Sequence, residues 1–257
     1  MGTAKKIATI GISFFALVGI MFTLVWVGMN FGLFNVRGSI HERNSFFTSA
    51  ASVAAASLPC TQASCEWLTS AEWATVRAGL AKDAPVIARV ASETGVPARM
   101  IAAAVIPEQM RFFTSEREVY KSVFEPLKIL GPMSEFSLGV SGIKMETARE
   151  IERRLGTTTP ETDLYARLTD PHDHYYSYLY TALFIKLVSA DWAAAGYPIS
   201  NRPAIIATLF NIGFANSHPN PTPQSGGSTI TVDGINYLFG DLAQSFYDSG
   251  ELTEFVK

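Results

Sequence analysis

Cysteine, histidine and charge are all scarce in this chain of 257 residues, which contains two Cys and four His and is only 17% charged. Two cysteines are too few for a disulfide scaffold, and they lack the four clustered Cys or His ligands of a structural zinc site. Because 48% of the residues are hydrophobic, disordered, collagen-like and low-complexity chains are excluded as well. The composition predicts at least one packed hydrophobic core.

Acidic residues are missing from the amino-terminal segment that contains Lys5, Lys6 and Arg37. These three account for part of the 20 basic residues, so the chain after Arg37 holds 17 basic and all 23 acidic residues, a net charge of −6. Nucleic-acid binding depends on neutralising phosphates with Lys and Arg. The net negative charge of the chain after Arg37 therefore argues against nucleic acid as a partner.

The same segment contains a long apolar run. No charged residue occurs between Lys6 and Arg37, and residues 7–27 are almost all Ile, Leu, Val, Phe, Met, Ala, Gly or Trp. A helix of about 20 such residues spans a membrane, whereas the apolar region of a cleavable signal peptide has about 7 to 15. We therefore predict a cytoplasmic tail at residues 1–6 and a retained transmembrane anchor at residues 7–34, with a removed signal peptide as the alternative.

The two lysines before the anchor predict its orientation. Positive charge stays on the cytoplasmic side, which makes this a single-pass protein of the cytoplasmic (inner) membrane with its C-terminal domain in the periplasm. Residues 35–65 are rich in Ser, Ala, Thr and Asn and predict an extracytoplasmic linker. In that oxidising compartment a small disulfide loop between Cys60 and Cys65 is favoured over two free thiols.

The remainder, residues 66–257, has the caps and the periodicity of a single, mainly α domain. Residues 171–195 are apolar in nearly every direction around a helix axis, which predicts a central core helix buried on all sides. Only residues 228–232, a β-branched run after two glycines, resemble a strand. The other expected helices are one opened by a Thr69–Glu72 capping box, one opened by Asp83 and closed by Gly95, one opened by Pro97, and those at residues 142–155, 203–213 and 234–247.

A carboxylate falls on the apolar face of the helix opened by Pro97. Ile101, Val105 and Phe112 define that face, and Glu108 lies seven residues after Ile101. Burial disfavours a charged carboxylate, so we expect a raised pKa, as in a general acid that protonates a glycosidic oxygen. The alternatives are an ion pair with an arginine such as Arg99 or Arg111, or rotation of the side chain into solvent.

Four motifs around this glutamate occur in a recognisable order. The series Gly95, Val96, Pro97, Ile101, Ala102 and Glu108 resembles the first motif of the lysozyme-like lytic transglycosylases, in which a helix delivers a single catalytic glutamate. Residues 137–148 resemble the second motif, Leu168-Thr169-Asp170-Pro171 the Asp-Pro opening of the central helix, and residues 207–213 the Ala-x-Tyr-Asn-x-Gly signature. Together the motifs cover about residues 85 to 215 and imply a lysozyme-like transglycosylase domain at residues 66–257.

The resemblance implies a reaction and a set of site residues. The implied substrate is peptidoglycan glycan strands, and Glu108 alone would be acid and base in cleaving the bond between N-acetylmuramic acid and N-acetylglucosamine to give 1,6-anhydro ends. No metal or other cofactor is called for. The residues implied to bind substrate are Gln109, Ser137, Gly139, Val140, Ser141, Phe210, Asn211 and, as the late cleft tyrosine, Tyr237.

The chain departs from the family pattern at three positions. Gln109 stands where the family usually has Ser, Gly142 where it has Gln, and Phe210 where it has Tyr. Gly142 and Phe210 favour a second hypothesis, a catalytically weak or inactive peptidoglycan-binding or scaffolding subunit of an envelope protein complex. A hydrolase resembling goose-type lysozyme is the variant of the enzymatic hypothesis, and it needs a second acid from Glu116, Glu118 or Glu125. A third hypothesis is a helical, membrane-tethered interaction domain in which the motif matches are accidental. For His172, Asp173 and His174 we expect helix-capping and surface roles and no metal site.

Overall fold

A computed structural model describes residues 65–113, 137–170 and 172–256, together with Ala16, Gly19, Ile20 and Thr23. The chain divides into two units, Met1–Thr48 and Ser49–Lys257. In the first unit, the four described residues are helical, and the Thr23 hydroxyl donates to the Gly19 carbonyl at 2.9 Å. The rest of the expected tail and anchor, and the linker up to residue 64, lie outside the described residues. Within the described residues, no helix combines the length and apolarity needed to cross a membrane.

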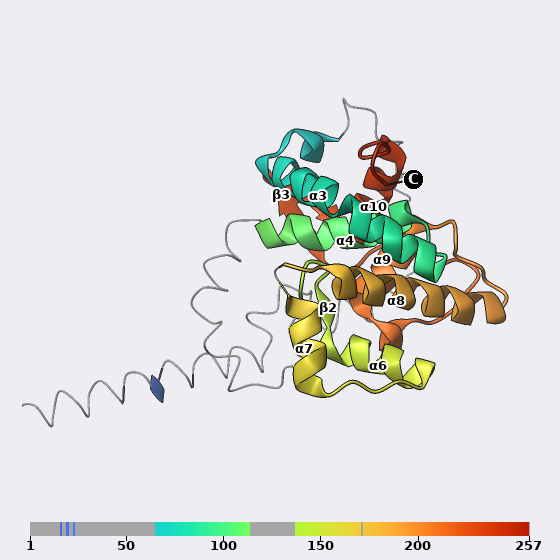
Figure 1. Ribbon diagram of the computed structural model, residues 1–257. Helices are drawn as coiled ribbons and strands as arrows, with labels where there is room; N and C mark the ends of the chain where they lie inside the picture. The colour runs from blue at the N-terminus through green and yellow to red at the C-terminus, as the bar shows by residue number, and fades with distance from the viewer. Residues whose placement is uncertain are drawn as a thin grey trace, which may run out of the picture. The chain divides into compact units, whose positions relative to one another are not determined.

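The second unit is mainly α, as expected, with two small antiparallel hairpins (Figure 1). Its first elements are η1 (Glu66–Thr69), α3 (Ala71–Thr94), α4 (Ala98–Phe113), β1 (Ser137–Leu138), β2 (Ile143–Lys144) and α6 (Met145–Leu155). They are followed by α7 (Glu161–Thr169), α8 (Tyr175–Ala194), α9 (Pro203–Ile212), η4 (Phe214–Asn216), β3 (Thr229–Val232), β4 (Ile235–Leu238) and α10 (Phe239–Ser249).

Helix α3 runs without interruption through the two helices expected there. Its N-cap is Ser70, whose hydroxyl accepts from the Trp73 amide at 3.0 Å, so the expected Thr69–Glu72 capping box is wrong by one residue. Asp83 does not begin a new helix, because α3 continues through Pro85, where the ring removes one backbone donor. Gly95 ends the helix in the left-handed conformation, with φ of 76°, as predicted.

Helix α4 is the central helix, a position that the sequence assigned to α8. Residues 100–106 are at most 2% exposed, and α4 packs against α3, α8, α9 and α10 (Figure 1). In α8, by contrast, Leu179, Leu183 and Leu187 are only partly buried and Lys186 is exposed. The prediction that α8 is buried on all sides is therefore wrong, since a stripe at four-residue spacing stays half-exposed.

Two predicted helices begin later than expected because a hairpin precedes each. Gly142 and Ile143 belong to the turn and second strand of β1–β2, and α6 starts only at Met145. Strand β3 confirms the expected strand, but residues 235–238 form its partner β4, and α10 starts at Phe239. Asp233 and Gly234 join the strands with φ of 49° and 79°, as a two-residue Asp-Gly turn requires.

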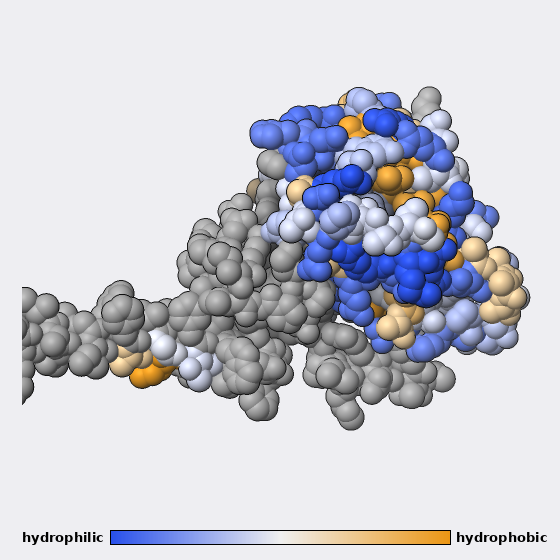
Figure 2. Space-filling model, turned by 60° about the horizontal axis from the view of Figure 1, so that its bottom comes forward, coloured by the Kyte–Doolittle hydropathy of each residue, from blue (hydrophilic) through white to orange (hydrophobic). Residues whose placement is uncertain are grey.

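The first described residues of the second unit are joined to α10. Cys65 is disulfide-bonded, in agreement with the expected loop, and the only other cysteine, Cys60, lies outside the described residues. The Trp67 indole is fully buried and donates to the Ser245 hydroxyl at 2.9 Å. The face shown in Figure 2 is mainly hydrophilic, with apolar side chains in small separate areas.

Candidate functional site

Glu108 lies near the C-terminal end of α4 and is only 6% exposed. The predicted position on the apolar face is therefore confirmed for this side chain, and Ile101 and Val105 on the same face are fully buried. The side chain of Phe112, the third residue used to define that face, lies outside the described part of the chain. Pro107 is accommodated inside α4, which continues to Phe113.

The Glu108 carboxylate forms an ion pair with Arg111, one turn further along the same helix. Nη2 of Arg111 lies 2.5 Å from both carboxylate oxygens, and each side chain is 8% exposed. Of the alternatives weighed for Glu108, this contact is the one observed. Because a guanidinium at this distance favours the ionised carboxylate, the surroundings of Glu108 are not the wholly apolar ones that the sequence suggested.

Arg99, the other arginine considered, has a different task. It is 9% exposed and donates to three backbone carbonyls at and beyond the end of α10, those of Phe246, Tyr247 and Glu251, at 2.9, 3.0 and 2.7 Å. Burial lowers the pKa of Arg99. The three hydrogen bonds of Arg99 join α4 to α10, and none of them involves Glu108.

The turn between β1 and β2, residues 139–142, packs directly on Glu108. Gly142 has φ of +65°, and a Cβ added there would lie 2.1 Å from Glu108 Cγ and 2.6 Å from Oε1. Nε2 of the neighbouring Gln109 donates to the Val140 carbonyl in the same turn. The second motif of the resemblance is thus adjacent to the glutamate of the first, although 31 residues separate Gln109 from Val140.

The opposite end of this turn packs on other helices. A Cβ on Gly139 would lie 2.0 Å from the Leu168 carbonyl oxygen and 2.2 Å from Ser177 Oγ, so the backbone approaches α7 and α8 closely. Ser141, within the turn, is fully buried, and its hydroxyl has no hydrogen-bond partner among the described residues. Ser137 pairs with Lys144 across the hairpin, and the placement of the Ser137 side chain is outside the described part.

Ser228, just before β3, links Arg111 to the fourth motif. Its hydroxyl is 3.3 Å from Arg111 Nη1 and 3.2 Å from Asn211 Nδ2, while the Ser228 amide donates to Asn211 Oδ1 at 2.9 Å. Both ends of the Asn211 amide are therefore engaged with Ser228. The sequence analysis did not identify Ser228 as a site residue. The local signal that could have found it is its place at the start of the β-branched run after Gly226 and Gly227.

Two of the expected substrate-binding residues have internal packing contacts. Phe210 is 9% exposed and packs edge-on against Phe184 in the core, with ring centroids 5.5 Å apart. Tyr237, on β4, is half-buried, and desolvation raises the pKa of its hydroxyl, with the Trp67 backbone as a hydrogen-bonding neighbour. These two are not among the residues that the structure shows in contact with Glu108 or Arg111.

A second polar cluster joins α3 to α8. Oδ2 of buried Asp83 lies 2.6 Å from His174 Nδ1 and accepts from the Tyr178 hydroxyl at 2.8 Å, and burial raises the pKa of Tyr178 well above its usual value. The Asp170 carboxylate accepts from the backbone amides of His172 and Asp173. No three His, Cys, Asp or Glu residues in the described ranges form a group suited to a metal ion. Glu116, Glu118 and Glu125 lie outside those ranges.

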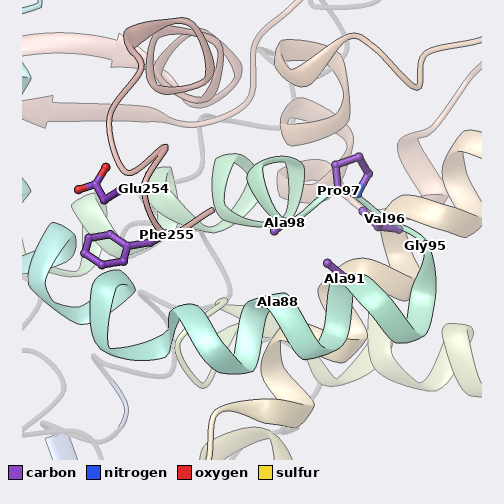
Figure 3. A pocket seen from close by; sticks show the side chains of 8 residues that line it. All are labelled: Ala88, Ala91, Gly95, Val96, Pro97, Ala98, Glu254 and Phe255. Carbon is purple, nitrogen blue, oxygen red and sulfur yellow. The ribbon is translucent and has the colours of Figure 1, made fainter. Parts of the chain in front are cut away.

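A cavity of about 430 Å³ lies at the opposite end of α4 (Figure 3). It is lined by α3, by the connection around Gly95 and Pro97, and by Glu254 and Phe255 near the C-terminus. Ala98, its contribution from α4, is ten residues from Glu108, about 15 Å along a helix. This cavity is separate from the Glu108 cluster.

Comparisons of the chain with protein-family models, with curated proteins and with solved structures find no match.

Proposed function

We propose that this protein is a peptidoglycan lytic transglycosylase with a lysozyme-like domain, in which Glu108 is the single acid and base. The observation that carries the proposal is the convergence of three separate motifs on one buried carboxylate. Gly142 from the second motif packs on Glu108, and Asn211 from the fourth is connected to Arg111 through Ser228. Accidental motif matches scattered over more than 100 residues would have no reason to meet at this point.

Glu108 would act twice, first as an acid and then as a base. Protonated Glu108 would donate to the oxygen between N-acetylmuramic acid and N-acetylglucosamine as the bond to the anomeric carbon breaks, and the substrate's own N-acetyl oxygen would form a bond to that carbon. The Glu108 carboxylate would then remove the proton of the muramoyl 6-hydroxyl, whose oxygen displaces the N-acetyl oxygen. The 1,6-anhydro sugar forms, water is not consumed, and Glu108 is protonated again.

The proposed cellular setting follows from the amino-terminal segment. Residues 7–34 would anchor the protein in the cytoplasmic membrane, and residues 35–65 would carry the catalytic domain into the periplasm, where its substrate lies. An envelope protein complex is the partner class that this setting suggests.

One observation favours the second candidate, a peptidoglycan-binding subunit without activity. Arg111 contacts both oxygens of Glu108, and such an ion pair opposes the protonation that a general acid requires. A structural ion pair of this kind is also what a retained but inactive fold would contain.

Digestion of purified sacculi separates the two candidates. The full chain in detergent micelles should release muropeptides with 1,6-anhydro ends, identified by mass spectrometry. Glu108→Gln should release none while keeping the helical circular dichroism of the unchanged protein. Binding to insoluble peptidoglycan without any release by the unchanged protein would support the binding subunit. Reducing ends in place of anhydro ends would identify a hydrolase.

A further inference from the structure

A buried arginine beside a candidate acid needs an explanation, because it works against protonation. Resting on the proposed function, we propose that Arg111 is the positioning residue of this site: it holds the Glu108 carboxylate against Gly142 and ties it to the β3–β4 hairpin through Ser228. The guanidinium donates in two directions. Nη2 binds Glu108 on α4, whereas Nη1 binds Ser228, which follows Arg111 by 117 residues.

Ser228 is itself held firmly, so it can orient the guanidinium. Its amide and hydroxyl both bind Asn211 on α9, and its carbonyl accepts from the Phe239 amide at 3.0 Å. The backbone of the preceding residue, Gly227, lies so close to the Asn211 side chain that an added Cβ would be 2.9 Å from Asn211 Oδ1. Three elements, α9, β3 and α10, thus fix the second anchor of Arg111.

Gly142 completes the arrangement on the other side of the carboxylate. Its missing side chain leaves the space that Glu108 occupies, since a methyl group there would overlap Cγ, Cδ and Oε1. The described residues of neighbouring elements that contact the pair are Gly142, on Glu108, and Ser228, on Arg111, and neither carries a charged side chain. Arg111 thus places a positive charge on the carboxylate, and Gly142 leaves the room for this orientation of Glu108.

This arrangement has a chemical consequence for the proposed reaction. When Glu108 has given its proton to the leaving oxygen, it becomes a carboxylate, and Arg111 would stabilise that form in place of solvent. The same contact restricts the carboxylate to the geometry needed to accept the proton of the 6-hydroxyl. Arg111 would thus act through Glu108 and need not touch the substrate.

The test compares Arg111→Gln and Arg111→Lys with Arg99→Gln, a matched loss of a buried arginine from the same helix. Carboxyl-carbon NMR of the full chain, with the Glu108 signal assigned by its absence in Glu108→Gln, gives the titration midpoint without any need for activity. Arg111→Gln should raise that midpoint by about one pH unit or more, Arg111→Lys should restore much of the original value, and Arg99→Gln should leave it unchanged. Ser228→Ala, which removes only the second anchor, is the variant to use if Arg111→Gln does not fold.

Activity supplies the second readout. If the unchanged protein releases anhydro-muropeptides, the alkaline limb of its rate–pH profile reports the loss of protonated Glu108. In Arg111→Gln that limb should move to higher pH with the NMR midpoint, and kcat should fall more than tenfold with KM little changed. An unchanged Glu108 midpoint in Arg111→Gln, or in Ser228→Ala, would overturn the inference while leaving the proposed function intact. A shifted Glu108 midpoint in a protein that releases nothing would support the inference about Arg111 and contradict the proposed function.

Discussion

Arg99 should contribute more to stability than any exposed ion pair on the helices around it. The four carbonyls at the C-terminal end of a helix lack partners within the helix, and Arg99 satisfies those of Phe246 and Tyr247 together with that of Glu251. The guanidinium also lies 4.7 Å from the centre of the Phe246 ring. Replacement by Met removes all three guanidinium donors, and only the Phe246 carbonyl keeps another side-chain donor, the Ser249 hydroxyl at 2.7 Å.

The expected loss follows from these contacts. A hydrogen bond to a charged group contributes about 1.5–3 kcal/mol, and the cost of dehydrating the guanidinium, visible as its lowered pKa, offsets part of the sum. We expect Arg99→Met to lower the free energy of unfolding by about 3–5 kcal/mol, the range for breaking a buried charge interaction. Urea unfolding followed by tryptophan fluorescence is a suitable assay, because Trp73 packs on Phe246 with ring centroids 6.0 Å apart.

The control is Arg89→Met, which removes an exposed arginine paired with Glu93 on α3. Exposed pairs of this kind contribute little, so this variant should unfold close to the unchanged protein. If Arg99→Met loses less than about 1 kcal/mol, water replaces the guanidinium at the carbonyls, and the reasoning about buried acceptors is refuted.

Two further predictions concern a glycine and a glutamate. Gly142→Ala should cost about 2–3 kcal/mol, since its methyl group would overlap Glu108 at a positive φ; Gly79→Ala, in open space within α3, should be neutral or stabilising in the same urea titration. Hydrogen bonds from Arg153 and Arg154 lower the pKa of Glu150 to about 2. The contribution of Glu150 to the free energy of unfolding should be present above the unfolded-state pKa of about 4.3 and be lost as the pH falls towards 2. Solvent exposure limits this contribution to about 1 kcal/mol. The stability difference between the unchanged protein and Glu150→Gln should therefore shrink from pH 6 to pH 3; a constant difference would show that the ion pairs are not its source.

The helices were predictable where a local signal is unambiguous. Gly95 ends α3 because glycine adopts the left-handed conformation without a steric penalty, and Pro97 precedes α4 because its fixed φ suits the start of a helix. Pro85 misled the prediction, because a helix that is held by tertiary packing tolerates a proline that local propensity counts as a boundary. The Asp233-Gly234 turn was a readable hairpin signal that was overlooked, and β4 was therefore assigned to a helix.

The candidate site was predictable only in part. The period of α4 places Glu108 inside, but a period cannot say which side chain will meet the carboxylate, and two arginines stood at plausible spacings. Which of them pairs with Glu108 depends on α10, whose carbonyls bind Arg99, and on Ser228, which binds Arg111. Such contacts join positions more than 100 residues apart, and no local pattern contains them.

The origin of the oxygen at the new glycan end tests the central claim most directly. Sacculi digested by the full chain in water enriched in heavy oxygen should give anhydro-ended fragments that carry no label at the muramoyl terminus, because the 6-hydroxyl of the sugar closes the ring. Labelled reducing termini, or intact glycan strands after prolonged digestion, would contradict the assignment of Glu108 as the sole acid and base of a transglycosylase.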